Sequence, residues 1–189
     1  MNEVAFINRL NTYNLFNKPN KSQVRVMLAI IDKFESDKSL TDKRWLAYIL
    51  ATVYHETAKT FEPIEEVGQG IRKPYGRKIK VNLKPYDLPD KLYYGRGLVQ
   101  LTWYDNYKKF GKLLGIDLLN QPELALKLDI SIDILILGMT RGLFTGVGLD
   151  KYFNAEKEDW VNARRIINGT DKAELIGLYA KKFYLCIST

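Results

Sequence analysis

The stretch at residues 44–67, RWLAYILATVYHETAKTFEPIEEV, constrains the fold most, because its apolar residues recur at the period of a helix. A helix from about residue 42 to residue 57 places Leu46, Ile49, Val53 and Glu56 on one face. Glu56 therefore continues an apolar stripe that must pack against other parts of the chain. The pattern predicts an inward-facing helix whose end carries a carboxyl group close to the core.

The position of Glu56 suggests acid chemistry. Burial disfavours a charged carboxylate, and the negative end of the helix dipole acts in the same direction. A carboxyl group that keeps its proton near neutral pH can donate it to a leaving group. In the alternative interpretation the helix frays at this point and Glu56 simply enters water.

The composition limits the classes of function. The chain has 189 residues, of which 46% are hydrophobic, so we expect one domain over residues 1–189. Its net charge of +7 predicts a polyanionic partner, either nucleic acid, an anionic membrane or a bacterial cell wall. The single cysteine, Cys186, excludes an intramolecular disulfide and suggests a reducing compartment, and the first residues lack the pattern of a signal peptide. With His55 as the sole histidine, sites with two or three histidine ligands are excluded, and we expect no metal and no cofactor.

The remaining periodicities predict a mainly α fold with a small extended or hairpin region. Residues 61–67 are expected to be extended or turned, and residues 68–91 to form a long basic loop or small hairpin, with disorder and binding both open as roles. The expected helices, with their caps, are a first one through Val4, Ile7 and Leu10; 23–34 after Ser22; the helix described above after Thr41; one from Thr102 to Gly115; a short one near 123–127; a buried one at 130–144; 157–167; and a last one with Asp171 and Glu174 as a capping box.

Paired carboxyl groups are the chemistry that the residue types favour. Cys186 lies in an apolar helix, which indicates an inert thiol, and the GRG sequence at residues 95–97 lacks the spacing of a phosphate-binding loop. Glu62, Glu65 and Glu66 follow Glu56 closely, and two carboxyl groups flanking a bond are the minimal equipment of a glycosidase.

The segment after the basic loop supplies side chains suited to a sugar. Tyr93, Tyr94, Trp103 and Tyr107 are candidates for stacking on sugar rings. Arg96, Gln100 and Asn106 are candidates for hydrogen bonds to hydroxyl and acetamido groups. The mixture of aromatic and basic residues is also compatible with nucleic-acid binding. In a purely structural interpretation the aromatic residues belong to the core and the polar residues cap helices.

Three stretches in a fixed order carry a resemblance to a known family. VYHETAKTF, YYGRGLVQLTWYDNY and IINGT at residues 166–170 resemble glycoside hydrolase family 19, the chitinase-like branch of the lysozyme superfamily. The absence of disulfides and of a signal sequence differs from the plant chitinases. In these respects the chain is more similar to phage and prophage endolysins of the same family.

The resemblance implies an α+β lysozyme-like fold, with the hairpin region beside the active-site cleft, and roles for individual residues. Glu56 matches the general acid, and His55 would orient the site. Tyr94, Arg96, Gln100 and Asn106 would line the glycan cleft, with Asn168 on its far wall. The second carboxylate is Glu65 or Glu66, which point to opposite faces of an extended segment, and we favour Glu65. The family inverts configuration, so the two carboxyl groups should stand roughly 6.5–9.5 Å apart around a water molecule.

The sequence therefore predicts an endolysin that hydrolyses the β-1,4 glycan strands of peptidoglycan. We expect a monomer made in the host bacterial cytoplasm that reaches the wall after release, with no nucleic-acid partner. The C-terminal helix, which carries Lys181 and Lys182, is a candidate for contact with an anionic outer membrane. The alternatives are a chitinase on the same fold, or a non-catalytic module that binds glycan or nucleic acid.

Overall fold

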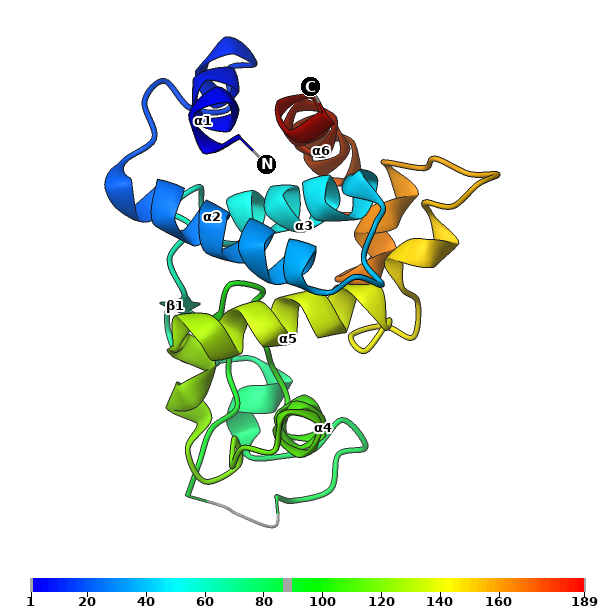
Figure 1. Cartoon of the computed structure of the whole chain (residues 1–189). Helices are drawn as coiled ribbons and strands as arrows, with labels where there is room; N and C mark the ends of the chain where they lie inside the picture. The colour runs from blue at the N-terminus through cyan, green and yellow to red at the C-terminus, as the bar shows by residue number, and fades with distance from the viewer. Residues whose placement is uncertain (1, 87–89, 189) are drawn as a thin grey trace. The chain divides into compact units, whose positions relative to one another are not determined.

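The computed structural model describes residues 2–86 and 90–188 and confirms a mainly helical fold with one small two-stranded sheet. The chain forms two compact units. The first consists of Met1–Phe61 and Leu135–Thr189, and the second of Glu62–Ile134. The second boundary falls inside helix α5 (Leu128–Thr140), so each unit contains part of that helix (Figure 1). The expectation of a single catalytic domain stays a prediction.

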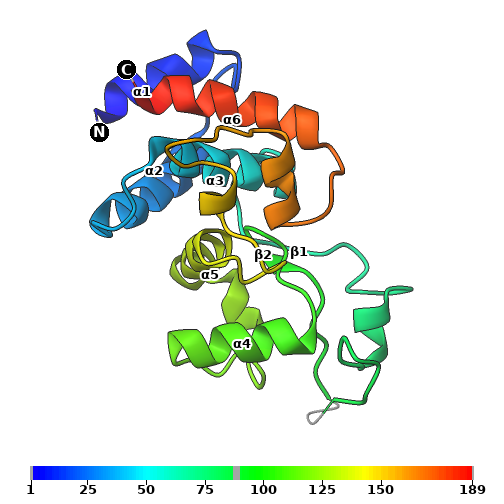
Figure 2. The same cartoon turned by 90° about the vertical axis from the view of Figure 1, so that its right-hand side faces the viewer.

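Helix α3 (Lys43–Glu56) is the core element of the first unit. Nine consecutive residues from Leu46 to Tyr54 are buried, so the helix is enclosed on almost every side. Helix α6 (Ala173–Ser188) packs along α3, and α1 (Glu3–Thr12) packs on α6, as Figure 2 shows. An aromatic cluster of Tyr54, Phe61 and Phe183 closes the C-terminal end of α3. Burial of each such ring contributes about 1.5–3 kcal/mol to the free energy of folding. The cluster therefore fixes the turn that carries Glu56.

Two helix starts in the first unit differ from the sequence-based prediction. Helix α2 (Lys21–Ser36) is capped by Asn20, which forms a reciprocal capping box with Gln23, and not by Ser22. Helix α3 is capped by Asp42, whose carboxylate accepts the backbone N–H of Arg44. In both cases a planar side chain of the Asx type accepts the free backbone N–H groups, as such residues do at least as well as Ser or Thr.

The second unit is built around a short antiparallel pair of strands. Strand β1 (Ile64–Glu65) pairs with β2 (Arg96–Gly97), with Glu65 opposite Arg96. Gly97 has a φ of 86°, and a Cβ there would lie 2.6 Å from the Oγ of Ser131. Only glycine fits this position. The backbone N–H of Leu98 donates to the same Ser131 hydroxyl over 2.7 Å, which anchors β2 to the first turn of α5.

Helix α4 (Tyr104–Leu114) completes the second unit and ends at Gly115 in the left-handed conformation, as predicted. Its start was predicted less well. The N-cap position belongs to Trp103, with a φ of 73°, and not to Thr102. A short 3-10 turn, η2 (Pro122–Leu126), stands where a short helix was expected and contacts β2.

The later helices are shorter than their sequence patterns suggested. Helix α5 ends at Thr140, and the predicted helix at 157–167 is reduced to the 3-10 turn η4 (Asn162–Ile166). The backbone before it is held by a bridge between Phe153 and Glu158. Lys172, and not Asp171, takes the N-cap position of α6, because its carbonyl accepts the helical N–H of Ile176.

The extended and loop predictions after α3 are confirmed for the described residues. Residues 68–86 form turns, the 3-10 turn η1 (Pro74–Arg77) and a small hairpin closed by a bridge between Ile79 and Pro85. Residues 87–89 of the predicted loop lie outside the described part of the chain. Across the described ranges, none of the helices combines the length and the apolar character that crossing a membrane requires.

Candidate active site

Glu56 is the last residue of α3, and its side chain is 17% exposed. The residues that share its helix face, Leu46, Ile49 and Val53, are buried as the periodicity predicted. Glu56 does not enter water freely, because Nη1 of Arg164 donates a hydrogen bond to its Oε1 over 2.6 Å. The guanidinium group is 5% exposed, so the two side chains form a buried ion pair.

Arg164, which contacts Glu56, is not among the site residues that the sequence predicted. It lies on η4, and its Nε also donates to the backbone carbonyl of Asp171 over 3.1 Å, so the guanidinium is fixed on two sides. These two hydrogen bonds fix Arg164 beside Glu56 and give the contacted carboxyl oxygen a defined position. The one signal for Arg164 in the sequence was its place two residues before the IINGT stretch.

The neighbours of Glu56 in the chain have separate structural roles. Burial lowers the pKa of His55, with the nearby charges of Arg164 and Lys172 acting in the same direction and Glu56 opposing them. The hydroxyl of Thr57 donates to the carbonyl of Val53 and accepts the N–H of Phe61. Thr57 thus turns the chain immediately after Glu56. His55 itself is half-buried.

In the second unit, Glu65 is held by two donors while it stays open to solvent. Its side chain is 41% exposed. The hydroxyl of Tyr94 donates to Oε1 of Glu65 over 2.9 Å, and Nε of Arg96 lies 3.4 Å from the same oxygen. Both donors hold the carboxylate in one orientation while part of it stays open to solvent.

Arg96 is buried beneath this carboxylate, with only 6% of the residue exposed. Its Nη1 donates to the carbonyl of Leu92 and to the hydroxyl of Tyr107, which in turn donates to the carbonyl of Tyr94. The guanidinium carbon lies 3.6 Å from the centre of the Tyr94 ring. Through these contacts Arg96 holds Glu65 and Tyr94 in place. A direct contact between Arg96 and a sugar stays a prediction.

Glu66 points to the opposite side of the strand, as the alternation of an extended segment requires. Its Oε1 accepts the hydroxyl of Tyr75 over 2.7 Å, and its Oε2 accepts the backbone N–H of Gly95 over 3.1 Å. Burial and the hydrogen bond with Glu66 raise the pKa of Tyr75. Glu66 therefore connects Tyr75 to the segment before β2.

The other predicted binding residues lie in different settings. The amide nitrogen of Gln100 donates to the carbonyls of Ile64 and Gly97, which braces β1 against β2. The amide of Asn106 donates to the carbonyl of Thr102 at the start of α4. Asn168 is exposed in the first unit. The roles of Gln100, Asn106 and Asn168 in binding stay predictions.

The aromatic residues of the YYGRGLVQLTWYDNY stretch divide into two groups. Tyr93 and Tyr107 are fully buried, with ring centres 5.2 Å apart, and belong to the core. The prediction that these two rings stack on a sugar is therefore wrong, and the core interpretation is confirmed for them. Trp103 is half-buried and contacts Tyr75 edge to face.

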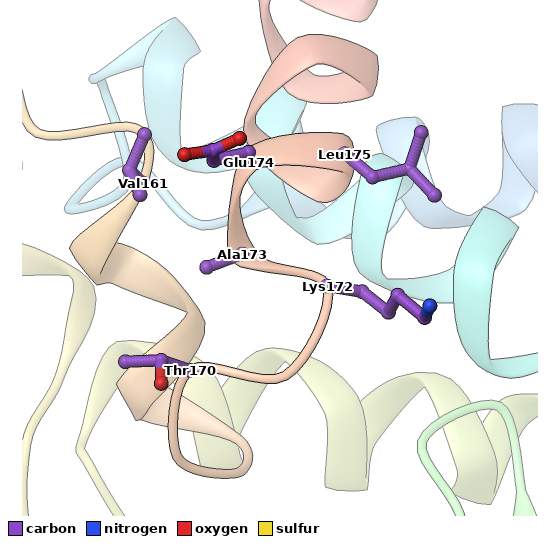
Figure 3. Close-up of a pocket in the computed structure, with 6 residues that line it drawn as sticks. All are labelled: Val161, Thr170, Lys172, Ala173, Glu174 and Leu175. Carbon is purple, nitrogen blue, oxygen red and sulfur yellow. The ribbon is translucent and has the colours of Figure 1, made fainter.

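A hollow of about 450 Å³ lies in the first unit at the start of α6. Figure 3 shows Thr170 at its base and the side chains of Val161 and Glu174 at one edge, whereas Lys172 extends away along the ribbon. The hollow follows directly on the IINGT stretch but is not lined by Glu56. Within residues 2–86 and 90–188, no group of three His, Cys, Asp or Glu side chains is placed to hold a metal ion.

Comparison with known proteins decides the family. The sequence matches the family signature of glycoside hydrolase family 19, chitinase class I, over residues 33–134, which is more than half of the chain. The chain belongs to glycoside hydrolase family 19. The family 19 match contains Glu56, Glu65 and Arg96, and it ends before Arg164.

Similar proteins carry the name chitinase. An Arabidopsis thaliana endochitinase is 34% identical over 101 residues, which cover 53% of this chain and 34% of that protein. The inactive chitinase-like protein 1 of Hevea brasiliensis is 58% identical over 37 residues, or 20% of this chain and 12% of that protein. The chain thus aligns with only 34% and 12% of the length of these two relatives. The crystal structure of chitinase C from Streptomyces griseus has the same fold, with a TM-score of 0.64 at 24% identity, covering 100% of this chain and 78% of that one.

Proposed function

We propose that this family 19 protein hydrolyses the β-1,4 bonds of a glycan rich in N-acetylated amino sugars, by an inverting mechanism. The observation that carries the proposal is that two carboxyl groups, Glu56 and Glu65, are each hydrogen-bonded by a buried arginine, Arg164 and Arg96. An ion pair between exposed side chains contributes little to stability. A buried guanidinium group, in contrast, holds the carboxyl group that it contacts in a defined orientation.

Glu56 is the proposed general acid. Arg164 holds Oε1, so the transferable proton is carried on Oε2, where it can pass to the glycosidic oxygen. As the bond breaks, the proton leaves Glu56 and the carboxylate that remains is stabilised by the guanidinium. The ion pair between Arg164 and Glu56 therefore forms as the proton leaves, and an interaction gained during the reaction favours catalysis.

Glu65 is the proposed general base, in preference to Glu66. It is exposed enough to contact water, and hydrogen bonds from Tyr94 and Arg96 hold it in one orientation. Both oxygens of Glu66 are used within the second unit, by Tyr75 and by the N–H of Gly95. A residue with both oxygens engaged in structural hydrogen bonds is poorly suited to removing a proton from water.

Chitin-type oligomers are the first substrate to test, because the similar proteins are named chitinases. The release of reducing ends from a soluble N-acetylglucosamine hexamer is the informative measurement, with Glu56→Gln as the matched control. Glutamine has nearly the same shape and cannot supply the proton. Turnover by the wild-type protein, lost in the variant, supports the proposal, and equal turnover by both proteins refutes it.

Peptidoglycan is a second candidate substrate, favoured by the net charge of +7 and by a run of basic residues in the second unit. The glycan of peptidoglycan carries carboxylates on its lactyl and peptide groups, whereas chitin is neutral, so cations favour the former. Purified sacculi, incubated with the protein and assayed for new reducing ends, test this choice. An endolysin must cleave sacculi. Cleavage of chitin oligomers without cleavage of sacculi would rule out the endolysin and identify the protein as a chitinase.

The non-catalytic alternative also needs a test, because a stretch of 37 residues is 58% identical to part of a protein named inactive. A binding module retains glycan affinity and shows no turnover on either substrate. Measuring affinity and turnover on the same preparation separates this alternative from both enzymes.

A further inference from the structure

Residues 67–86 of the second unit combine strong positive charge with exposed apolar side chains. This segment, called the basic loop below, has six cationic residues and no acidic residue: Arg72, Lys73, Arg77, Lys78, Lys80 and Lys84. It also exposes four large aliphatic side chains: Val67 (100%), Ile71 (74%), Val81 (59%) and Leu83 (72%). Exposed apolar side chains that are grouped together and surrounded by polar residues often mark a site of interaction with a protein or a membrane.

The basic loop is anchored by its aromatic residues. Tyr75 donates to Glu66 over 2.7 Å, and the hydroxyl of Tyr86 donates to the carbonyl of Tyr75 over 2.8 Å. Tyr86 also stacks on Tyr104, with ring centres 5.2 Å apart. The two tyrosines therefore pack against the second unit, whereas the aliphatic side chains are exposed to solvent. A loop that is already ordered loses little conformational entropy when it binds.

The tip of the small hairpin presents apolar side chains between lysines. The N–H of Lys80 donates to the carbonyl of Lys84 over 2.8 Å, and the N–H of Leu83 donates to the carbonyl of Lys80 over 2.9 Å. These bonds place Val81 and Leu83 in the turn itself. Leu83 has a φ of 65°, a conformation that glycine or asparagine adopts far more readily than leucine. Leu83 is 72% exposed, so most of its side chain lies outside the core.

We propose that the basic loop docks on the surface of an anionic lipid bilayer. The lysines and arginines meet the anionic head groups, and the aliphatic side chains enter the boundary between head groups and acyl chains. A glycan or a nucleic acid would use the cations but would offer the aliphatic groups much less apolar surface than the acyl chains of a bilayer do. The combination therefore favours lipid over both polyanions. This inference does not depend on which glycan the protein cleaves.

Helix α6 offers the natural comparison, because it was the membrane contact expected from the sequence. It exposes Leu175, Leu178 and Leu185 beside Lys181 and Lys182, but less fully than the basic loop exposes its aliphatic residues, at 39%, 51% and 43%. Its main apolar face is buried, with Ile176, Ala180 and Phe183 in the core. Variants on α6 therefore serve as matched controls for variants on the basic loop.

Co-sedimentation of the full chain with lipid vesicles tests the proposal. We expect binding to vesicles of phosphatidylglycerol and phosphatidylethanolamine, and little binding to pure phosphatidylcholine. Val81→Ser with Leu83→Asn should weaken binding by about tenfold or more, because apolar burial is lost. Lys78→Gln with Lys84→Gln should weaken it by roughly thirtyfold, because each basic side chain near the surface contributes. The control Leu178→Ser with Leu185→Ser on α6 should bind as the wild type does.

Leu83→Asn alone separates binding from folding. Asparagine accepts the left-handed conformation, so the variant should melt at the same temperature as the wild type or higher, while its vesicle binding falls. Several outcomes overturn the proposal: equal binding to anionic and neutral vesicles, unchanged binding by the variants at residues 81 and 83, or loss of binding only in the α6 variant. Binding to a DNA duplex as tight as to anionic vesicles, and insensitive to the aliphatic substitutions, would assign the basic loop to a polyanion instead.

Discussion

Arg164 donates a hydrogen bond from Nη1 to Oε1 of Glu56 over 2.6 Å, and this bond joins two residues that are 108 positions apart in the chain. The pair connects η4 to the last residue of α3 inside the first unit. Glu56 therefore has a fixed orientation before any substrate arrives. Pre-organisation of this kind is the main way in which a protein scaffold assists proton transfer, because the acid need not be ordered during the reaction.

Replacing Arg164 tests its role as a positioning residue. Arg164→Gln removes the guanidinium hydrogen bonds to Glu56 and to the carbonyl of Asp171, and should lower the free energy of unfolding by about 1–3 kcal/mol. Arg164→Lys keeps the charge but loses the two-sided hydrogen bonding, so the fold should be retained while kcat falls more than KM changes. Arg165→Gln is the control, because that neighbour is exposed. Equal effects at positions 164 and 165 would contradict the assignment.

Substitutions of the adjacent residues Glu65 and Glu66 should have different effects, the first on activity and the second on stability. Glu65→Gln should lower kcat by about 10²–10⁴-fold, as expected for the loss of a general base, with little change in melting temperature. Glu66→Gln should retain most of the activity but lose about 1 kcal/mol or more of stability, because its hydrogen bonds to Tyr75 and Gly95 are structural. Activity lost only in the Glu66 variant would reverse the choice between them.

The burial of His55 predicts a pH dependence of stability. Its pKa is lowered from the usual 6.5 in the folded protein, so the unfolded chain binds a proton more readily. Linkage then requires the contribution of His55 to be fully present above about pH 6.5 and to be lost as the pH falls through its lowered pKa. Urea unfolding of wild type and His55→Gln at pH 7.5 and pH 5 measures this effect. The wild type should lose more stability than the variant over that range; a parallel loss in both would contradict the prediction.

Local patterns in the sequence predicted much of the fold. The helical period of residues 44–57 identified α3 and the face that carries Glu56. The glycine at position 115 marked the end of α4, and the alternation of an extended segment separated Glu65 from Glu66. These features depend on residues close together in the chain, so a single sequence contains their physical cause.

Long-range contacts could not be predicted in the same way. Nothing near Arg164 indicates that it meets Glu56, and nothing near Arg96 indicates that its guanidinium lies under Tyr94. The predicted helix at 157–167 failed for a related reason. The bridge between Phe153 and Glu158 and the fully buried packing of Ile166 override the local helical pattern and leave only η4.

The central claim is that Glu56 delivers a proton to the glycosidic bond. Reducing-end release by Glu56→Gln and wild type, on the glycan that the wild type cleaves, tests it most directly. The account predicts a loss of several orders of magnitude in kcat for the variant, with glycan affinity and melting temperature retained. A Glu56→Gln protein that cleaves the glycan as fast as the wild type would contradict it.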